Sequence, residues 1–219
     1  MHIPDSFLPL SHALVYWVIA LPFIYLSFRW ARREMDDMKV PVLAALAAGI
    51  FAIQALNIPI GMGTSGHMVG ATLVAIIFAS PMAGVLVLTL VLLVQGFVFA
   101  DGGITAMGAN ILNMGVISGF TGYYAFVTLR KMKLGMKSAS FIGAWAGLLI
   151  SAIAASVQLT VAGLFPLVAG ITAMGTYHLV IGFVGEGLIT AIAIAAIERS
   201  RPDLLENSFL NPEHGGSVA

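Results

Sequence analysis

The sequence has no cysteine and little charge. Its 219 residues therefore contain no disulfide bond, thiolate metal site or cysteine nucleophile. Asp, Glu, Lys and Arg together make up 9% of the chain, whereas soluble proteins average about 25%. The ten basic and ten acidic residues cancel, so no net charge points to nucleic acid or to an acidic substrate. With 59% apolar residues and a mean hydropathy of +0.99, the composition indicates an integral membrane protein.

Two sequence signals are also missing. There is no Walker A pattern, G-x-x-x-x-G-K-[ST], so we expect that the chain does not hydrolyse ATP and is not an enzyme. The first fifteen residues contain no Lys or Arg, whereas a signal peptide opens with a basic region. Removal of the initial methionine requires a small second residue, and His2 is large. We therefore expect a free Met1 amine, exposed outside the cell.

Long charge-free runs set the number of membrane spans. A spanning helix needs roughly 20 apolar residues. The run 67–99 is too long for one helix and is interrupted at Ser80-Pro81, where proline disfavours a continuous helix, so it is divided into two. The sequence then predicts an all-α membrane protein with about seven transmembrane helices, within the runs 12–28, 40–57, 67–99, 105–129, 138–163 and 170–197.

The basic residues predict the orientation, because cytoplasmic loops collect Lys and Arg. With seven spans and the N-terminus outside, all ten basic residues lie on the cytoplasmic side; with 67–99 as one span, four lie inside and six outside. We therefore predict a single membrane domain with an external N-terminus and a cytoplasmic C-terminus. It consists of an external N-terminal segment (1–11), a seven-helix bundle (12–197) and a cytoplasmic tail (198–219).

The N-terminal sequence Met1-His2-Ile3-Pro4-Asp5 offers a chelating group. The amine, the His2 amide nitrogen and the His2 Nδ1 can close one five-membered and one six-membered ring around an ion. Three coplanar nitrogens suit Ni(II) or Cu(II), and imidazole is the commonest metal ligand. Pro4 would stiffen this segment. The alternative is that a histidine at position 2 has no role.

The external loop 57–67 brings a second histidine to the same side. Four Gly or Pro residues allow sharp turns, and the loop ends at His67, which could supply a fourth nitrogen. The alternative is a histidine that is hydrogen-bonded to a neighbouring carbonyl at the start of a helix. Met62 and Met68 lie beside it and make copper(I) a minor alternative as the bound ion, since soft thioethers suit that ion.

One acid lies inside the predicted bundle. Glu186 is midway along the last span, where a charge costs about 2.5 to 3.5 kcal/mol, so we expect it to face inward and to have a partner. It either forms a structural bond between helices or has a role in supporting the ligands or in gating. His178 lies eight residues earlier on roughly the same face and either supports a ligand or bonds across helices. The candidate partners of Glu186 are Gln95, Asn110 and Asn113.

Two other classes of protein compete with a metal-binding subunit. The motif Gly63-Thr64-Ser65-Gly66 fits the short pattern of rhomboid-like intramembrane proteases, with His178 as the base for Ser65. This motif is short and leaves His2 and His67 unexplained. A stand-alone secondary transporter would need more ionisable residues at membrane depth than one acid and no Lys or Arg.

Four stretches carry a resemblance to a known family. They are Met-His-Ile-Pro-Asp-Ser-Phe-Leu at the start, Pro-Ile-Gly-Met-Gly-Thr-Ser-Gly-His-Met at 59–68, Gly-Ala-Asn-Ile-Leu-Asn-Met at 108–114 and Ile-Gly-Phe-Val-Gly-Glu-Gly-Leu at 181–188. Over nearly its whole length the chain resembles the CbiM/NikM family. Those proteins are the substrate-specificity subunits of energy-coupling factor importers for cobalt or nickel. Ser6 stands where the family usually has glycine.

The resemblance implies a ligand set and surrounding residues. The Met1 amine, the His2 amide and imidazole, and His67 would bind Ni(II) or Co(II) in a plane, with no other cofactor. The N-terminal segment and the 57–67 loop would form a lid over the ion. The residues that would support the ligands or belong to this lid are Asp5, Thr64, Ser65, Asn110 and His178.

The resemblance also implies partners in the cell membrane. They are a transmembrane coupling (T) subunit, cytoplasmic ATPase (A) subunits and a small membrane N subunit, alongside lipid and without nucleic acid. Ala44, Ala48 and Ala52 recur every fourth residue, and such small-residue stripes let helices approach closely. In this family they are candidates for the face that docks on the coupling subunit, in an importer that serves cobalamin biosynthesis. Internal packing is the alternative.

Overall fold

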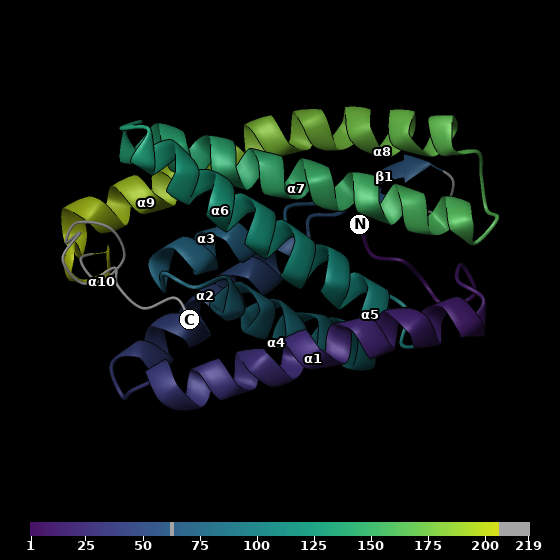
Figure 1. Ribbon diagram of the computed structural model, residues 1–219, viewed down its shortest axis with the longest axis horizontal. Coiled ribbons are helices and arrows are strands. Elements are labelled where there is room, and N and C mark those ends of the chain that lie inside the picture. The colour runs from purple at the N-terminus through teal and green to yellow at the C-terminus, as the bar shows by residue number, and fades with distance from the viewer. Residues whose placement is uncertain (62–63, 206–219) are drawn as a thin grey trace.

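The computed structural model describes residues 1–61 and 64–205, and these are largely helical. In chain order the elements are α1 (Leu10–Glu34), α2 (Lys39–Gln54), β1 (Ile58–Gly61), β2 (Thr64–Gly66), α3 (Ala71–Ile77), α4 (Pro81–Phe99), α5 (Met107–Asn110), the π-helix η1 (Ile111–Ile117), α6 (Ser118–Lys131), α7 (Met136–Val161), α8 (Leu167–Ile181), the π-helix η2 (Gly182–Gly187), α9 (Leu188–Ser200) and α10 (Asp203–Leu205). The long helices lie side by side along the long axis of the molecule (Figure 1).

Four helices of the described chain are long and apolar enough to cross a membrane. They are α1, α4, α7 and the continuous helix Leu167–Ser200, which joins α8, η2 and α9. The protein is therefore a multi-pass membrane protein, and the count of seven crossings stays a prediction. The helices differ in burial: 17% of the most apolar stretch of α1 is buried inside the protein, against 61% for α4. Most of α1 therefore faces outward.

The predicted interruption at Ser80-Pro81 is present. Helix α3 ends at Ile77, Ala79 has a positive φ of 51°, and the Ser80 hydroxyl accepts a bond of 3.3 Å from the Met82 amide as α4 begins at Pro81. The preceding helix is shorter than expected. Residues 67–70 are not helical, because they pair their polar groups with other parts of the chain, so α3 has only seven residues.

The loop that leads to His67 contains a small antiparallel hairpin, which the sequence analysis did not predict. Its strands β1 and β2 pair Ile58 with Gly66 and Pro59 with Ser65. Met62, proposed as a copper ligand, lies outside the described residues, and Thr64 is placed in β2 by its backbone only. The hairpin lies near α8, as Figure 1 shows for β1.

Two stripes of small residues have opposite environments. Gly143 and Gly147 of α7 face α6 so closely that an added Cβ would lie 2.7 Å from the Gly122 carbonyl oxygen and 2.6 Å from that of Ser118. This stripe packs inside the bundle, as helix association in membranes favours. The other stripe, formed by Ala44, Ala48 and Ala52 of α2, is exposed.

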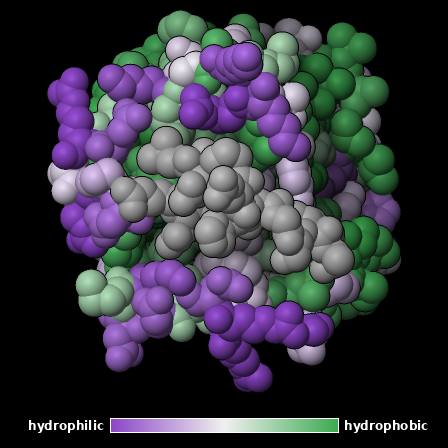
Figure 2. All heavy atoms as spheres, turned by 60° about the vertical axis from the view of Figure 1, so that its left-hand side comes forward, coloured by the Kyte–Doolittle hydropathy of each residue, from purple (hydrophilic) through white to green (hydrophobic). Residues whose placement is uncertain are grey.

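Positive charge collects at one end of the bundle. The last turns of α1, α6 and α9 carry basic residues, namely Arg32, Arg33, Arg130, Lys131 and Arg199. These helices run in the same direction and end on the side where α10 lies (Figure 1). Figure 2 shows that hydrophilic side chains gather at this end. That this end lies on the cytoplasmic side stays a prediction.

Candidate metal site

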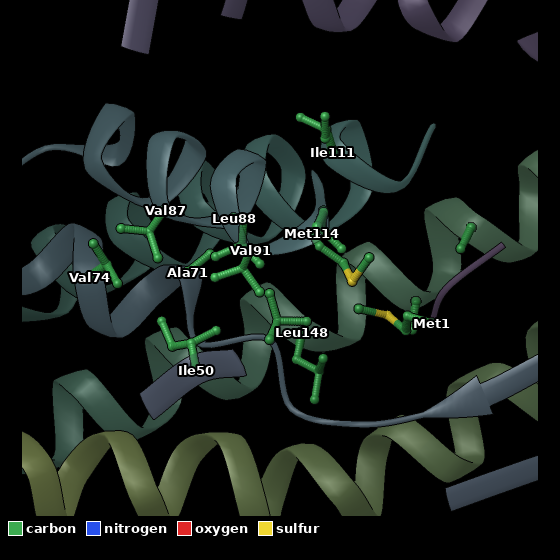
Figure 3. Packing of buried hydrophobic residues seen from close by; sticks show 14 of the residues in the cluster. Met1, Ile50, Ala71, Val74, Val87, Leu88, Val91, Ile111, Met114 and Leu148 are labelled. Atoms are coloured by element: carbon green, nitrogen blue, oxygen red, sulfur yellow. The ribbon is translucent and has the colours of Figure 1, made fainter. Parts of the chain in front are cut away.

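The N-terminus is folded into the interior of the protein. Met1 and Ile3 are each 1% exposed and His2 is 5% exposed. The expectation of an exposed terminus is therefore wrong, because the apolar Met1 and Ile3 side chains gain by leaving the surface. Figure 3 shows Met1 within the main hydrophobic core, near Met114 and Leu148.

Hydrogen bonds to the main chain of Ile3 fix the first residues in place. The Asn110 side chain bonds Ile3 twice: its Oδ1 accepts from the Ile3 amide at 2.8 Å, and its Nδ2 donates to the Ile3 carbonyl at 3.1 Å. The Gly103 amide donates to the same carbonyl at 2.9 Å. Asn110 is fully buried, so these bonds form away from water. It acts as an anchor for the chain that carries His2.

Asp5 forms a second anchor nearer the surface. Its carboxylate accepts bonds from the Ile104 amide, the Thr105 amide and the Thr105 hydroxyl at 3.1, 2.8 and 2.6 Å. The Thr105 hydroxyl bond is the largest cause of a lowered Asp5 pKa. Gly103 packs against this segment so closely that a Cβ there would lie 2.4 Å from the Asp5 amide nitrogen. Asp5 therefore fastens the N-terminal segment to the loop after α4.

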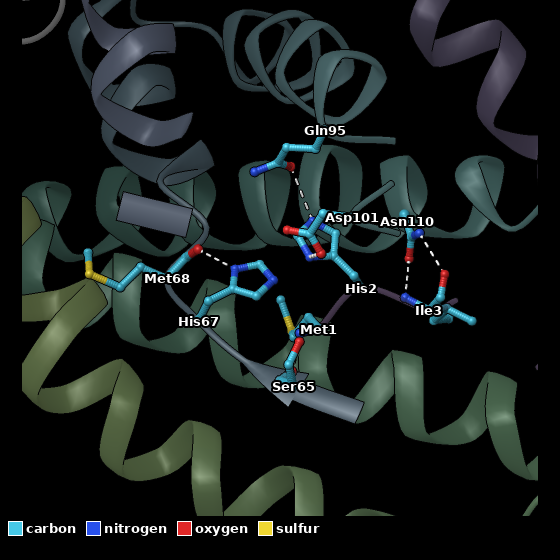
Figure 4. Close-up of polar contacts among 9 residues, drawn as sticks. All are labelled: Met1, His2, Ile3, Ser65, His67, Met68, Gln95, Asp101 and Asn110. Carbon is cyan, nitrogen blue, oxygen red and sulfur yellow. Dashed lines mark hydrogen bonds and ion pairs between the residues drawn. The ribbon is translucent and has the colours of Figure 1, made fainter. Parts of the chain in front are cut away.

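The three predicted ligand residues meet. The rings of His2 and His67 stack with centroids 4.5 Å apart and planes 25° apart, and the Met1 amine donates to the Ser65 carbonyl oxygen (Figure 4). Among the described residues, no three His, Asp, Glu or Cys side chains form a metal-sized cluster. A metal site here would therefore need nitrogens of the main chain as well as the two imidazoles.

Hydrogen bonds leave one nitrogen free on each ring. His67 Nδ1 donates to the Met68 carbonyl at 2.7 Å, and His2 Nε2 donates to Gln95 Oε1 at 3.2 Å. Within the described chain, His67 Nε2 and His2 Nδ1 are buried and have no hydrogen-bond partner. The expected bond from His67 to a neighbouring carbonyl is therefore present, and its role as a metal ligand stays a prediction that the unpartnered Nε2 allows.

A carboxylate faces the free nitrogen of His2. Asp101 Oδ1 lies 3.3 Å from His2 Nδ1, without hydrogen-bond geometry. With its proton on Nε2, His2 donates to Gln95 Oε1 and turns the Nδ1 lone pair toward a second acceptor. Two acceptors at this distance repel each other, and a bound cation would relieve that repulsion.

Burial keeps these nitrogens uncharged. It lowers the pKa of the Met1 amine from 8.0 to about 4, against an opposing effect of the Asp101 charge. Burial, followed by the charge of the amine, lowers the pKa of His2 to about 3, and burial holds the pKa of His67 well below 6.5. Burial also raises the pKa of Asp101. At neutral pH the amine and both imidazoles are therefore deprotonated, the form in which nitrogen binds metal.

Ser65 and His178 do not form a proteolytic pair. His178 Nδ1 donates to the Met174 carbonyl of its own helix at 2.8 Å, and its buried Nε2 has no hydrogen-bond partner in the part of the chain that the structure describes. In the described chain, the base of the protease hypothesis thus makes no hydrogen bond to its nucleophile. Ser65 contributes a carbonyl oxygen to the Met1 amine instead. The Thr64 side chain lies outside the described residues.

The predicted partners of Glu186 are wrong. Gln95 bonds His2, Asn110 bonds Ile3, and Asn113 forms two reciprocal 2.8 Å bonds with Gln158. Glu186 accepts hydrogen bonds from two main-chain amides, those of Val69 and Gly70. A sequence pattern of side chains cannot reveal such partners, because every residue except proline carries an amide hydrogen.

Sequence reasoning missed Gln95 and Asp101 as neighbours of His2. Gln95 was considered only as a partner of Glu186, although a buried glutamine in the apolar helix α4 requires a hydrogen-bond partner of its own. Asp101 is the acid in the short connection between α4 and α5, which the chain brings against the N-terminal segment. Its position on the predicted external side was the available signal.

Fold and site together define a multi-pass membrane protein with a buried group of uncharged nitrogens. A family model described as the cobalt uptake substrate-specific transmembrane region, CbiM, matches residues 2–204. The chain belongs to this family of membrane proteins for metal transport.

Individual relatives cover nearly the whole chain. A protein of Methanocaldococcus jannaschii named for metal transport is 36% identical over 211 residues, which cover 93% of this chain and 94% of that protein. A fused protein of Archaeoglobus fulgidus named for nickel transport is 38% identical and matches 94% of this chain and 68% of its own length. The crystal structure of a transition metal transporter superposes with a TM-score of 0.86 at 31% identity, covering 96% of this chain and 99% of that one.

Proposed function

We propose that the protein binds Ni(II) or Co(II) from outside the cell as the substrate-specificity subunit of an ATP-driven energy-coupling factor importer. The ligands are the Met1 amine, the His2 amide nitrogen, His2 Nδ1 and His67 Nε2. One observation carries the proposal: the Met1 amine and the stacked His2 and His67 rings lie together in the interior. Each of the two imidazoles keeps one nitrogen without a hydrogen-bond partner in the described chain. Unpartnered buried nitrogens are costly unless a ligand uses them.

The chemistry of the donors supports a late first-row metal. Four nitrogens, one of them a main-chain amide, favour a planar geometry, which suits Ni(II) better than Co(II). A thiolate is absent from the chain, and Asp101 supplies a negative charge beside His2 for the incoming cation. The names of relatives include both cobalt and nickel, so we propose one binding site that accepts either ion, with a preference for nickel.

The proposed partners supply the ATP hydrolysis for which this chain has no motif. Its sequence has no Walker A motif, so ATP hydrolysis is assigned to separate A subunits that act through a T subunit, together with a small membrane N subunit. We propose that the exposed stripe of Ala44, Ala48 and Ala52 on α2 docks on the T subunit, since small residues allow a close approach between helices. The basic end of the bundle then faces the cytoplasmic ATPases.

An extended N-terminus tests the proposed ligand set. We expect that two residues added before Met1, which convert the amine into an amide and move the histidine to the fourth position, reduce Ni(II) and Co(II) affinity by more than about 100-fold, beyond the usual loss for residues that only support a ligand. Titration calorimetry on the purified protein in detergent measures this. The same residues added after Ala219 serve as the control. Unchanged binding by the N-terminally extended protein would contradict a terminal-amine ligand.

A further inference from the structure

Glu186 is a fully buried carboxylate in the middle of the last long helix. It lies in η2, the π-helical turn between α8 and α9, and none of its surface is exposed. Isolated π-helical turns within α-helices occur frequently at functional sites, and acidic residues at membrane depth are rare and have partners. The four-nitrogen proposal assigns no role to this residue.

Both carboxylate oxygens bind the segment that follows His67. Oε2 accepts from the Val69 amide at 2.7 Å and Oε1 accepts from the Gly70 amide at 2.8 Å. On the other side, Gln54 Nε2 of α2 donates to the Val69 carbonyl at 2.9 Å. Gly70 has a φ of +80°, and a Cβ there would lie 2.7 Å from an Ile50 side-chain carbon. The segment is therefore held between α2 and η2.

One peptide group connects Glu186 to His67. The Met68 carbonyl accepts the bond from His67 Nδ1, and the amide of the same peptide group, on Val69, donates to Glu186. A peptide group is planar, so the position of its N–H determines the direction of its C=O. The bond from the Val69 amide to Glu186 also strengthens the carbonyl as an acceptor, because linked hydrogen bonds polarise one another. Figure 4 shows the hydrogen bond between His67 and the Met68 carbonyl, at one end of this series.

We propose that Glu186 is a positioning residue of the metal site, which acts through the Met68–Val69 peptide group to hold the His67 proton on Nδ1 and to present Nε2 to the ion. In many metal sites a carboxylate or carbonyl bonds the second nitrogen of a ligand histidine. Here the carbonyl performs that role, and the carboxylate lies one peptide group behind it. The expected effect of Glu186 on metal affinity rests on the proposed function. Its effect on the His67 proton does not, because it exists without metal.

The Glu186→Gln variant of the full-length protein tests this role. Glutamine keeps the size of the side chain but presents an NH₂ group to one of the two amides, which leaves that amide without an acceptor. We expect Ni(II) affinity to fall by about 10- to 100-fold, the usual loss when a partner of a ligand is removed. Gln158→Met is the control, because it breaks a buried polar pair with Asn113 rather than a bond to the His67 segment. It should leave the affinity unchanged.

A double-mutant cycle separates positioning from general stability. His67→Ala retains the three nitrogens of the N-terminal chelate, which still bind Cu(II), the strongest binder among the divalent ions of this series. If Glu186 acts through His67, Glu186→Gln lowers Cu(II) affinity in the wild-type background and has no effect in the His67→Ala background. An equal loss in both backgrounds would overturn the proposal, as would unchanged Ni(II) affinity for Glu186→Gln alone.

The tautomer of His67 gives a readout without metal. Nitrogen NMR on selectively labelled, metal-free protein should show the proton on Nδ1 in the wild type and a mixture of tautomers in Glu186→Gln. An unchanged tautomer in the variant would refute the role of Glu186. The two proposals can fail separately: if neither the N-terminal extension nor His67→Ala affects Ni(II) binding, the ligand set is wrong, whatever the tautomer of His67 shows.

Discussion

The two segments that meet at the candidate site are held in different ways. The N-terminal segment is a chain end fastened by Asn110 and, at the exposed surface, by the Asp5 bonds to the loop after α4. The segment 67–70 is internal to the chain and is fixed between two helices by Gln54 and Glu186. The first segment is covalently joined to the bundle on one side only, whereas the second is joined on both sides. The proposed metal site therefore combines a chain end with an internal segment.

Metal affinity should depend most on the internal segment 67–70, which carries His67. We expect His67→Ala to reduce Ni(II) affinity by more than about 100-fold, because it removes a ligand rather than a supporting partner. Ser65→Ala is the matched control: Ser65 contributes its main-chain carbonyl to the Met1 amine, which alanine retains. Calorimetry on both variants measures the difference. Loss of binding in Ser65→Ala, or loss of a proteolytic activity in that variant, would count against the metal model.

Loss of Asn110, which anchors the N-terminal segment, should weaken metal binding. Asn110→Leu removes both side-chain bonds to Ile3, so the N-terminal segment must be ordered by the ion itself. We expect a loss of Ni(II) affinity of about 10- to 100-fold, seen mainly as faster release in stopped-flow chelator competition. Asn113→Leu lies three residues further along the same helical segment and breaks the bonds to Gln158 instead. If both variants lose affinity equally, the anchor has no specific role.

A smaller effect is expected where the last long helix approaches the internal segment 67–70. A Cβ at Gly185 would lie 3.0 Å from Met68 Cγ, so Gly185→Ala must shift the Met68 side chain next to the carbonyl that orients His67. We expect a few-fold loss of Ni(II) affinity at unchanged expression. Gly175→Ala on α8 is the control, since a Cβ there meets no atom within 4 Å. Equal affinities for the two variants would show that Met68 moves without affecting His67.

The sequence indicated which histidines lie together but not their environment. His2 and His67, whose rings stack in the structure, stand out in the sequence because a chelating terminus and a second external histidine form a recognisable chemical pattern. The burial of Met1 and Ile3 could not, since it depends on a core assembled from α4, α7 and other helices. The partner of Glu186 was missed because main-chain amides carry no sequence signal.

The helices show the same contrast. The break at Ser80-Pro81 was predictable from proline chemistry, whereas the shortening of α3 follows from the bonds that residues 69 and 70 make with distant residues. The small-residue stripes on α2 and α7 look alike as patterns. Only the packing distinguishes the buried Gly143 and Gly147 from the exposed Ala44, Ala48 and Ala52.

The sparse burial of α1 has a practical consequence. Because 17% of its most apolar stretch is buried, against 61% in α4, apolar exchanges along α1 leave most of the core packing intact, while the same exchanges in α4 create cavities or overlaps. Helix α1 directly follows the N-terminal segment. A spin label or fluorophore on the outward face of α1 would therefore report on the neighbouring N-terminal segment with little disturbance of the bundle.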